Sequence, residues 1–174
     1  EGKLSPELIR LPNGVRIVAL PTAMLATSTV AVFIRSGSAH EPKLVNGISH
    51  VVEHMLFKGT ATRDARRINL DAENLGADVN AHTERDHTAF YMRGLPEHSG
   101  DFVRMLADIV QNPTFPEAEL EREREVLLNE HTEVEDDPMS TAYELFDHAC
   151  YGLHPAAQQG VGSRRNIERL SRAE

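Results

Sequence analysis

Three ionisable side chains within an otherwise apolar segment constrain the fold of this chain more than any other feature. His50, Glu53 and His54 lie in the run NGISHVVEHMLFKGT. On a helix, residues three and four apart share a face, so these three project from one side and the apolar residues form the opposite side. Because buried ionisable groups need partners, the fold must bring further polar groups to this face.

The spacing of these three residues is typical of a metal site. Two imidazoles at positions i and i+4 can bind one cation, and neutral histidine suits Zn²⁺. The carboxylate of Glu53 would then lie beside the metal, where it can take a proton from water. For a bare His-x-x-x-His pair, two surface histidines are the better interpretation. Here the central glutamate and the apolar surroundings favour the metal site.

A third ligand is expected from the acidic run PEAELEREREVLLNEHTEVEDD, because a tetrahedral site with one open position needs three protein ligands. On a helix of roughly 100° per residue, Glu119, Glu123 and Glu130 fall within about 40° of one another. We expect Glu130 as the ligand and Glu123 as a group that holds a histidine or the ligand, although spacing alone does not separate the two roles. Four apolar residues are expected on the same side, namely Leu120, Val126, Leu127 and Val134. Four charged residues are expected to face water, namely Glu121, Arg122, Arg124 and Glu125.

The rest of the sequence predicts strands first and mostly helices afterwards. Asn13-Gly14 between two alternating runs predicts a hairpin, TSTVAVFIRSGS a strand, and DVNAHTERDHTAFYMRGL a second hairpin. This order favours an α+β fold, with a mostly antiparallel sheet packed against helices, in a single domain over residues 1–174. Helices are expected from Asn46, as the capping residue, to Phe57, and over residues 64–75, 96–111, 116–134 and 138–151.

Composition excludes several classes of protein. The formal net charge of −9 argues against a nucleic-acid binder. No apolar run approaches the roughly 20 residues of a membrane span. Cys150 is the only cysteine, so an intrachain disulfide and a cysteine-rich metal site are both excluded. We expect Cys150 to be a buried structural thiol.

The remaining histidines give weaker signals. His82, Asp86 and His87 are close in sequence, but a polar turn is a better interpretation than a second metal site. Five other histidines have no companion at ligand spacing and are expected at the surface or the edge of the core: His40, His98, His131, His148 and His154. The sequence does not identify the cellular compartment of the protein, and we expect the cytoplasm or periplasm of a bacterium.

Several segments together resemble one family. His50-Val51-Val52-Glu53-His54 is similar to the inverted zinc-protease motif, and its spacing to Glu130 resembles that of the M16 metallopeptidases. LPNGVRIVALP is similar to the first hairpin of that family, and GADVNAHTERDHTAFYMRGL to the segment that carries its Asn-Ala-x-Thr pattern. The chain is therefore identified as a member of the M16 zinc metallopeptidases, which include pitrilysin, insulin-degrading enzyme and the mitochondrial processing peptidase.

The resemblance implies the roles of the residues at the metal site. One Zn²⁺ would be held by His50, His54 and Glu130, with Glu53 as the general base and Glu123 as a supporting acidic residue. The activity implied is that of a zinc-dependent endopeptidase on a LuxS/MPP-like metallohydrolase half-domain.

The resemblance also implies where the substrate binds. The strand with Asn80, Ala81 and Thr83 would lie beside a peptide or unfolded protein, held as an added β-strand. Family members are usually longer, so this chain would be the N-terminal domain of a two-half protein. The C-terminal half or a partner subunit would supply an arginine and a tyrosine that help to hold the substrate. We expect the full-length protein to be a dimer and the isolated chain to be poorly active.

Two alternatives remain open. S-ribosylhomocysteine lyase also uses a His-x-x-Glu-His metal motif, with a cysteine as the third ligand. Cys150 lies ninety-six residues beyond His54, however, and the surrounding motifs differ. The second alternative is a non-catalytic M16 scaffold subunit. Such subunits typically lose ligands from the motif, whereas this sequence retains all of them.

Overall fold

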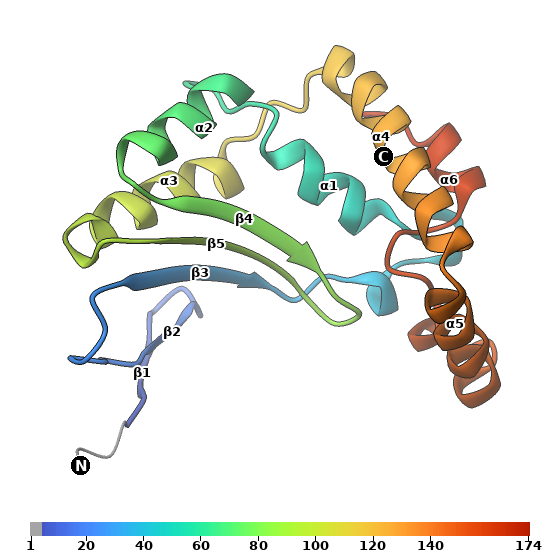
Figure 1. The fold of residues 1–174 in the computed structure, drawn as a ribbon, viewed down its shortest axis with the longest axis horizontal. Coiled ribbons are helices and arrows are strands. Elements are labelled where there is room, and N and C mark those ends of the chain that lie inside the picture. Colours follow the sequence, from blue (N-terminus) through green and yellow to red (C-terminus); the bar gives the residue numbers. More distant parts are fainter. Residues whose placement is uncertain (1–4) are drawn as a thin grey trace.

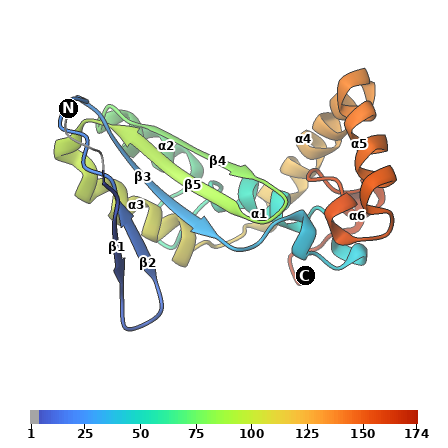
Figure 2. The ribbon, with the colours of Figure 1, turned by 90° about the horizontal axis from the view of Figure 1, so that it is seen from below.

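A three-stranded antiparallel sheet with two helices on one face forms the body of the molecule (Figure 1). The computed structural model describes residues 5–174, so residues 1–4 of the predicted domain lie outside the described residues. Helices α2 and α3 lie on the same face of the sheet in both views (Figures 1 and 2). The predicted α+β class is confirmed. The strand order is β3-β5-β4, with β3 at Ser28–Ile34, β4 at Asp78–Thr83 and β5 at Thr88–Gly94, and the helices are α2 at Ala65–Asn74 and α3 at Ser99–Gln111.

The first core lies between the sheet and these two helices. Ile68 of α2 and Phe102 of α3 pack against Phe90 and Met92 of the central strand β5, and all four are almost completely buried. Burial of a side chain of this size stabilises the fold by about 1.5–3 kcal/mol. The central strand is therefore fixed, and it fixes β4 beside it through the register that pairs Thr83 with Thr88.

A separate hairpin precedes the sheet, as Asn13-Gly14 predicts. Strands β1 (Glu7–Arg10) and β2 (Arg16–Ala19) pair with each other, and Gly14 has the positive φ of +89° that the turn requires. The hairpin projects from the sheet in both views (Figures 1 and 2), and apolar side chains such as Leu8 and Val18 are exposed.

Helix α1 (Ile48–Leu56) connects the first core to a second one. Leu56 packs into the first core, whereas Val51 and Met55 pack against α4 (Glu117–Asp136) and α6 (Arg164–Arg169). Because the apolar side of α1 packs into both cores, the predicted ionisable side with His50, Glu53 and His54 lies outside them and is only partly buried. The short α6, with the buried Ile167, is an element that the sequence patterns did not predict.

The remaining elements connect or flank these layers. Helix α5 (Pro138–Tyr151) follows α4 and has no buried residue in the described part of the chain. Among residues 5–174, no helix is both long and apolar enough to cross a membrane. The described residues also include four short 3₁₀ segments: η1 at Ser38–His40, η2 at Lys43–Val45, η3 at Pro96–His98 and η4 at Pro155–Ala157.

The start of α1 differs from the prediction that Asn46 caps this helix. Gly47 occupies the capping position with a φ of +101°, and no side chain of the capping residue bonds to the helix. The carboxylate of the buried Glu41 takes over this function by accepting the N–H groups of Gly47 and Ser49, both at 2.7 Å. A Cβ atom at Gly47 would lie 2.8 Å from the Cα of Gly162, so the close approach of the C-terminal segment requires glycine there.

Four further predictions are wrong for reasons of packing. Val126 is 41% exposed and His131 is buried, because the buried face of α4 runs through Leu120, Glu123, Leu127 and His131. Arg124 does not face water but donates to the backbone oxygens of Ile167 and Leu170. Cys150 is exposed, because α5 contributes no residue to a core.

Candidate metal centre

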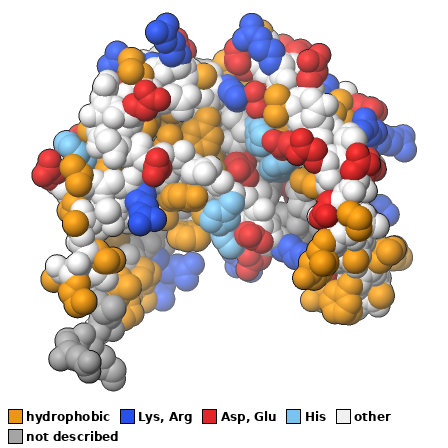
Figure 3. Space-filling view, viewed as in Figure 1, with side chains coloured by type: hydrophobic (Ala, Val, Ile, Leu, Met, Phe, Trp, Pro, Cys, Tyr) orange, Lys and Arg blue, Asp and Glu red, His pale blue; other side chains and the backbone are white. Residues whose placement is uncertain are grey.

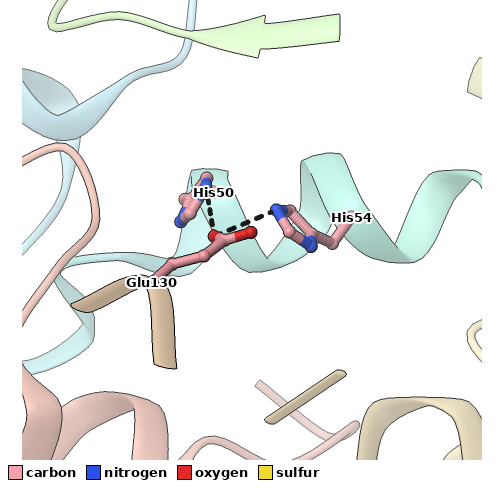
Figure 4. Close-up of side chains that lie close together, drawn as sticks. All are labelled: His50, His54 and Glu130. Atoms are coloured by element: carbon pink, nitrogen blue, oxygen red, sulfur yellow. Dashed lines mark ion pairs between the residues drawn. The ribbon is translucent and has the colours of Figure 1, made fainter. Parts of the chain in front are cut away.

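His50 and His54 of α1 converge with Glu130 of α4 at one point (Figure 4). The Nε2 atoms of both histidines lie 3.6 Å from the same Glu130 Oε2 atom. One donor atom from each of the three residues lies within 4.8 Å of the other two. Within residues 5–174 this is the one group of three or more such side chains that could hold a metal ion.

The distances within this group fit an ion better than they fit hydrogen bonds. At 3.6 Å, neither histidine makes a hydrogen bond to Glu130. Ligands at about 2.0–2.1 Å from a tetrahedral zinc ion are separated from one another by about 3.3–3.5 Å. Two imidazoles and a carboxylate are also a donor set that zinc accepts. The three residues therefore suit a zinc ion in both chemistry and spacing.

The surroundings of His50 favour the neutral imidazole that a metal needs. Burial lowers the pKa of His50 below its ordinary value, and the nearby His54 lowers it further, against the opposing effects of Glu130 and Glu41. The two imidazole rings stand edge to face with their centroids 4.7 Å apart. Near neutral pH, His50 therefore offers a nitrogen lone pair without first losing a proton.

Glu123 holds His54 from the side opposite Glu130. The Nδ1 atom of His54 lies 3.1 Å from Glu123 Oε2, and Lys58 Nζ lies 2.6 Å from Glu123 Oε1. Burial alone raises the pKa of Glu123, but the hydrogen bonds from Lys58 and His54 outweigh it, so this pKa lies below its ordinary value. An ionised Glu123 accepts the Nδ1 proton of His54 and leaves Nε2 free to bind a metal.

Glu53 is held by a strand of the sheet. Thr83, the last residue of β4, donates its hydroxyl to Glu53 Oε2 at 2.5 Å. Both side chains are partly buried. The sequence predicted Glu53 beside the metal ligands and Thr83 beside a peptide, but it gave no sign of a hydrogen bond between them.

The two other residues predicted at the substrate strand lie along β4. Asn80 is exposed, and its Oδ1 atom accepts the backbone N–H of Ala81 at 2.8 Å. Ala81 packs against the first core. Strand β4 is the last strand of the order β3-β5-β4, so its outer edge is not paired with another strand of the described chain.

One face of the molecule is hollowed near its middle (Figure 3). In the space-filling view, histidine and acidic side chains gather between the part built around the sheet and the part built from α4 and α5 (Figure 3).

Other candidate residues do not join this centre. His82 and His87 have ring centroids 5.5 Å apart, but they belong to no group of three possible metal ligands in the described part of the chain. Cys150 is likewise in no such group. Lys58 was missed at the sequence level. Its position four residues after His54, just beyond the end of α1, is the signal that could have indicated it.

Comparisons with known sequences point to one protein family. The family described as Insulinase (Peptidase family M16) matches residues 16–162. The chain is 37% identical over 155 residues to the uncharacterized zinc protease YmxG of Bacillus subtilis, which covers 89% of this chain and 38% of that protein. It is 38% identical over 164 residues to the beta subunit of the mitochondrial-processing peptidase of Bos taurus, which covers 94% of this chain and 33% of the relative.

Solved structures share the fold. A protease from Helicobacter pylori superposes with a TM-score of 0.91 at 24% identity, over 98% of this chain and 41% of that one. A peptidase M16 inactive domain from Pseudomonas fluorescens gives a TM-score of 0.88 at 23% identity, over 98% and 42%. The chain spans between 33% and 38% of the length of the two curated relatives.

Proposed function

The chain belongs to the insulinase family, peptidase family M16, and from this premise we propose that it is the zinc-binding catalytic domain of an endopeptidase. One observation carries the proposal, namely the approach of His50 Nε2 and His54 Nε2 to a single carboxylate oxygen of Glu130. His50, His54 and Glu130 would hold the ion, as the sequence motif predicts.

Glu53 is the proposed general base. A zinc ion, when bound, lowers the pKa of a coordinated water to about 7 and polarises a carbonyl group. Glu53 shares the helix face of His50 and His54, so its carboxylate is within the reach of the same centre. It would accept a proton from the attacking water and return that proton to the leaving amine.

Glu123 and Lys58 support the centre from behind. Lys58 compensates the charge of the largely buried Glu123, and Glu123 orients the His54 ring through Nδ1. Outer residues of this kind typically change metal affinity or activity by 10–100-fold when they are replaced. Their proposed role is to position His54 rather than to touch the substrate.

The free edge of β4 is the proposed site for the substrate backbone. An unpaired strand edge can accept an extended peptide through main-chain hydrogen bonds, and this tolerates varied side chains. Asn80 and Ala81 lie on that strand, and Thr83 ends it beside Glu53. The substrates proposed are therefore peptides or unfolded segments of proteins.

The chain is further proposed to be the N-terminal half of a longer protein. The chain covers only 38% and 33% of its two relatives, and one of them is by name a subunit of the mitochondrial-processing peptidase. A second half or a partner subunit would complete the substrate chamber, and the full-length protein is expected to be a dimer.

A non-catalytic subunit is the second candidate function. The likeness to a domain described as inactive in Pseudomonas fluorescens shows that the same fold occurs without activity. Retention of His50, Glu53, His54 and Glu130 favours the catalytic alternative. S-ribosylhomocysteine lyase uses a cysteine as its third ligand. Cys150 is exposed and lies outside the ligand group of the described chain, which disfavours this alternative.

The test is peptide cleavage by the full-length protein together with its zinc content. We expect one zinc ion per chain and hydrolysis of a quenched peptide. The Glu53→Gln variant should retain zinc and lose cleavage by at least about 100-fold. Full zinc loading without cleavage by the unmodified protein would identify the scaffold alternative instead.

A further inference from the structure

The hydroxyl of Thr83 connects the edge strand to the proposed base. Thr83 Oγ1 lies 2.5 Å from Glu53 Oε2, although the two residues are thirty positions apart in the sequence. Glu53 lies in the middle of α1, and Thr83 is the terminal residue of β4. The contact therefore crosses from the metal helix to the strand proposed to hold the substrate.

The direction of this hydrogen bond follows from its neighbours. Thr88, which pairs with Thr83 across the strands, donates its own hydroxyl proton to the backbone oxygen of Ser36 at 2.8 Å. The Thr83 and Thr88 oxygens are 3.4 Å apart, which is a weak contact. An ionised carboxylate only accepts, so Thr83 donates to Glu53. Its single proton is then not available to a second acceptor.

Thr83 is itself held rigidly. The register of β4 with the buried strand β5 fixes its backbone, and Thr88 beside it is buried. A β-branched threonine also has few χ1 alternatives on a strand. Thr83 therefore gives the flexible Glu53 side chain a fixed anchor for one of its two oxygens.

We propose that Thr83 is a positioning residue that acts through Glu53. By holding Oε2, its hydroxyl sets the orientation of the carboxylate and directs Oε1 to the proton that must be moved. This inference rests on the proposed peptidase function and assigns the Thr83 side chain to the base rather than to the peptide. Misplacement of a reacting group by about 1 Å can reduce a rate by about 100-fold, which gives such an anchor a measurable effect.

The test compares Thr83→Val, which removes the hydroxyl at nearly constant shape, with Thr83→Ser, which keeps it. Both are made in the full-length protein, with Thr29→Val as the matched control, because Thr29 is an exposed threonine on β3. We expect Thr83→Val to lower kcat by about 10–100-fold, the range for losing a hydrogen bond to a charged group. The KM, the zinc content and the melting temperature should be unchanged, and Thr83→Ser should restore most of the activity.

A second readout does not depend on turnover. Peptide affinity is measured by fluorescence anisotropy on the inactive Glu53→Gln protein, with and without Thr83→Val. We expect equal dissociation constants with and without Thr83→Val, because Thr83 acts only through Glu53. Thr83→Ala provides the same comparison if the valine lowers the melting temperature.

Three results would overturn the inference while leaving the proposed peptidase function intact. They are an unchanged kcat with a raised KM, weaker peptide binding by Thr83→Val in the Glu53→Gln background, and loss of zinc in Thr83→Val. A zinc-loaded unmodified protein that cleaves no peptide would instead contradict the proposed function itself, and this inference with it.

Discussion

The Nδ1 atom of His54 lies 3.1 Å from Glu123 Oε2, so this ring is held by the nitrogen that does not approach Glu130. The arrangement assigns different tasks to the two nitrogens of one imidazole. Glu123 fixes the orientation and the tautomer of the ring, and Nε2 remains for the metal. Lys58 holds the other oxygen of Glu123, so it acts on His54 through Glu123.

Lys58→Met should therefore weaken zinc binding by about 10–100-fold, the range for residues that orient a ligand from behind. Without the ammonium group, the buried carboxylate of Glu123 loses its charge partner and holds His54 less well. Zinc affinity is measured by competition with a chromophoric chelator, and the exposed Lys43→Met is the control. An unchanged affinity in Lys58→Met would show that Glu123 does not need this lysine.

Glu130→Gln should reduce zinc affinity more strongly than Lys58→Met, because it replaces a proposed ligand by a neutral amide. Glu125→Gln on the same helix is the matched control, since Glu125 is exposed and lies away from the centre. Elemental analysis after dialysis gives the zinc content of both variants. Equal zinc content in the two variants would remove Glu130 from the ligand set.

The metal-free chain should lose stability as the pH falls below about 6.5, the ordinary pKa of histidine. The pKa of His50 is lowered in the folded state, so the unfolded state binds its proton first and the free energy of unfolding decreases with falling pH. The decrease continues until the pH passes below the folded-state pKa. Urea unfolding at pH 7.5 and 5.5 should show a smaller loss for His50→Gln than for the unmodified chain. An equal loss in both would indicate that His50 is not desolvated.

Glu41→Ala should destabilise the chain by about 2–4 kcal/mol, because it leaves buried N–H groups at the start of α1 without an acceptor. Glu41→Gln keeps one acceptor oxygen and should lose less. The free energy of unfolding from urea titration measures both changes. A loss below that of an exposed control, Glu117→Ala, would show that water replaces Glu41 at this helix start.

Local patterns predicted most of this fold. The period-2 runs, the Asn13-Gly14 turn and the helix periodicity identified the strands of residues 5–174 and the longer helices, because each depends on near neighbours in the sequence. The i, i+4 spacing placed His50 and His54 on one face for the same reason. The local patterns did not predict Gly47 as the capping residue of α1 or Glu41 as the acceptor of its first N–H groups. Glycine is required at position 47 by the close approach of Gly162, which is a contact between segments distant in the sequence.

The candidate centre was predictable only in part. The wheel of α4 grouped Glu130 with Glu119 and Glu123 but did not separate the roles of Glu123 and Glu130. The same wheel placed Val126 inside and Arg124 outside, and the structure reverses both. Helix α4 packs against both α1 and α6, so its buried face depends on a helix that the sequence did not reveal. The contact of Thr83 with Glu53 joins separate elements and carries no local signal. For Lys58, the local signal is its position four residues after His54, which does not indicate the contact with Glu123 on α4.

The most direct test of the account is anomalous diffraction at the zinc absorption edge, from crystals of the zinc-loaded protein. We expect one strong peak about 2.0–2.2 Å from His50 Nε2, His54 Nε2 and a Glu130 oxygen. A peak elsewhere, or the absence of any peak between α1 and α4 at full zinc loading, would contradict it.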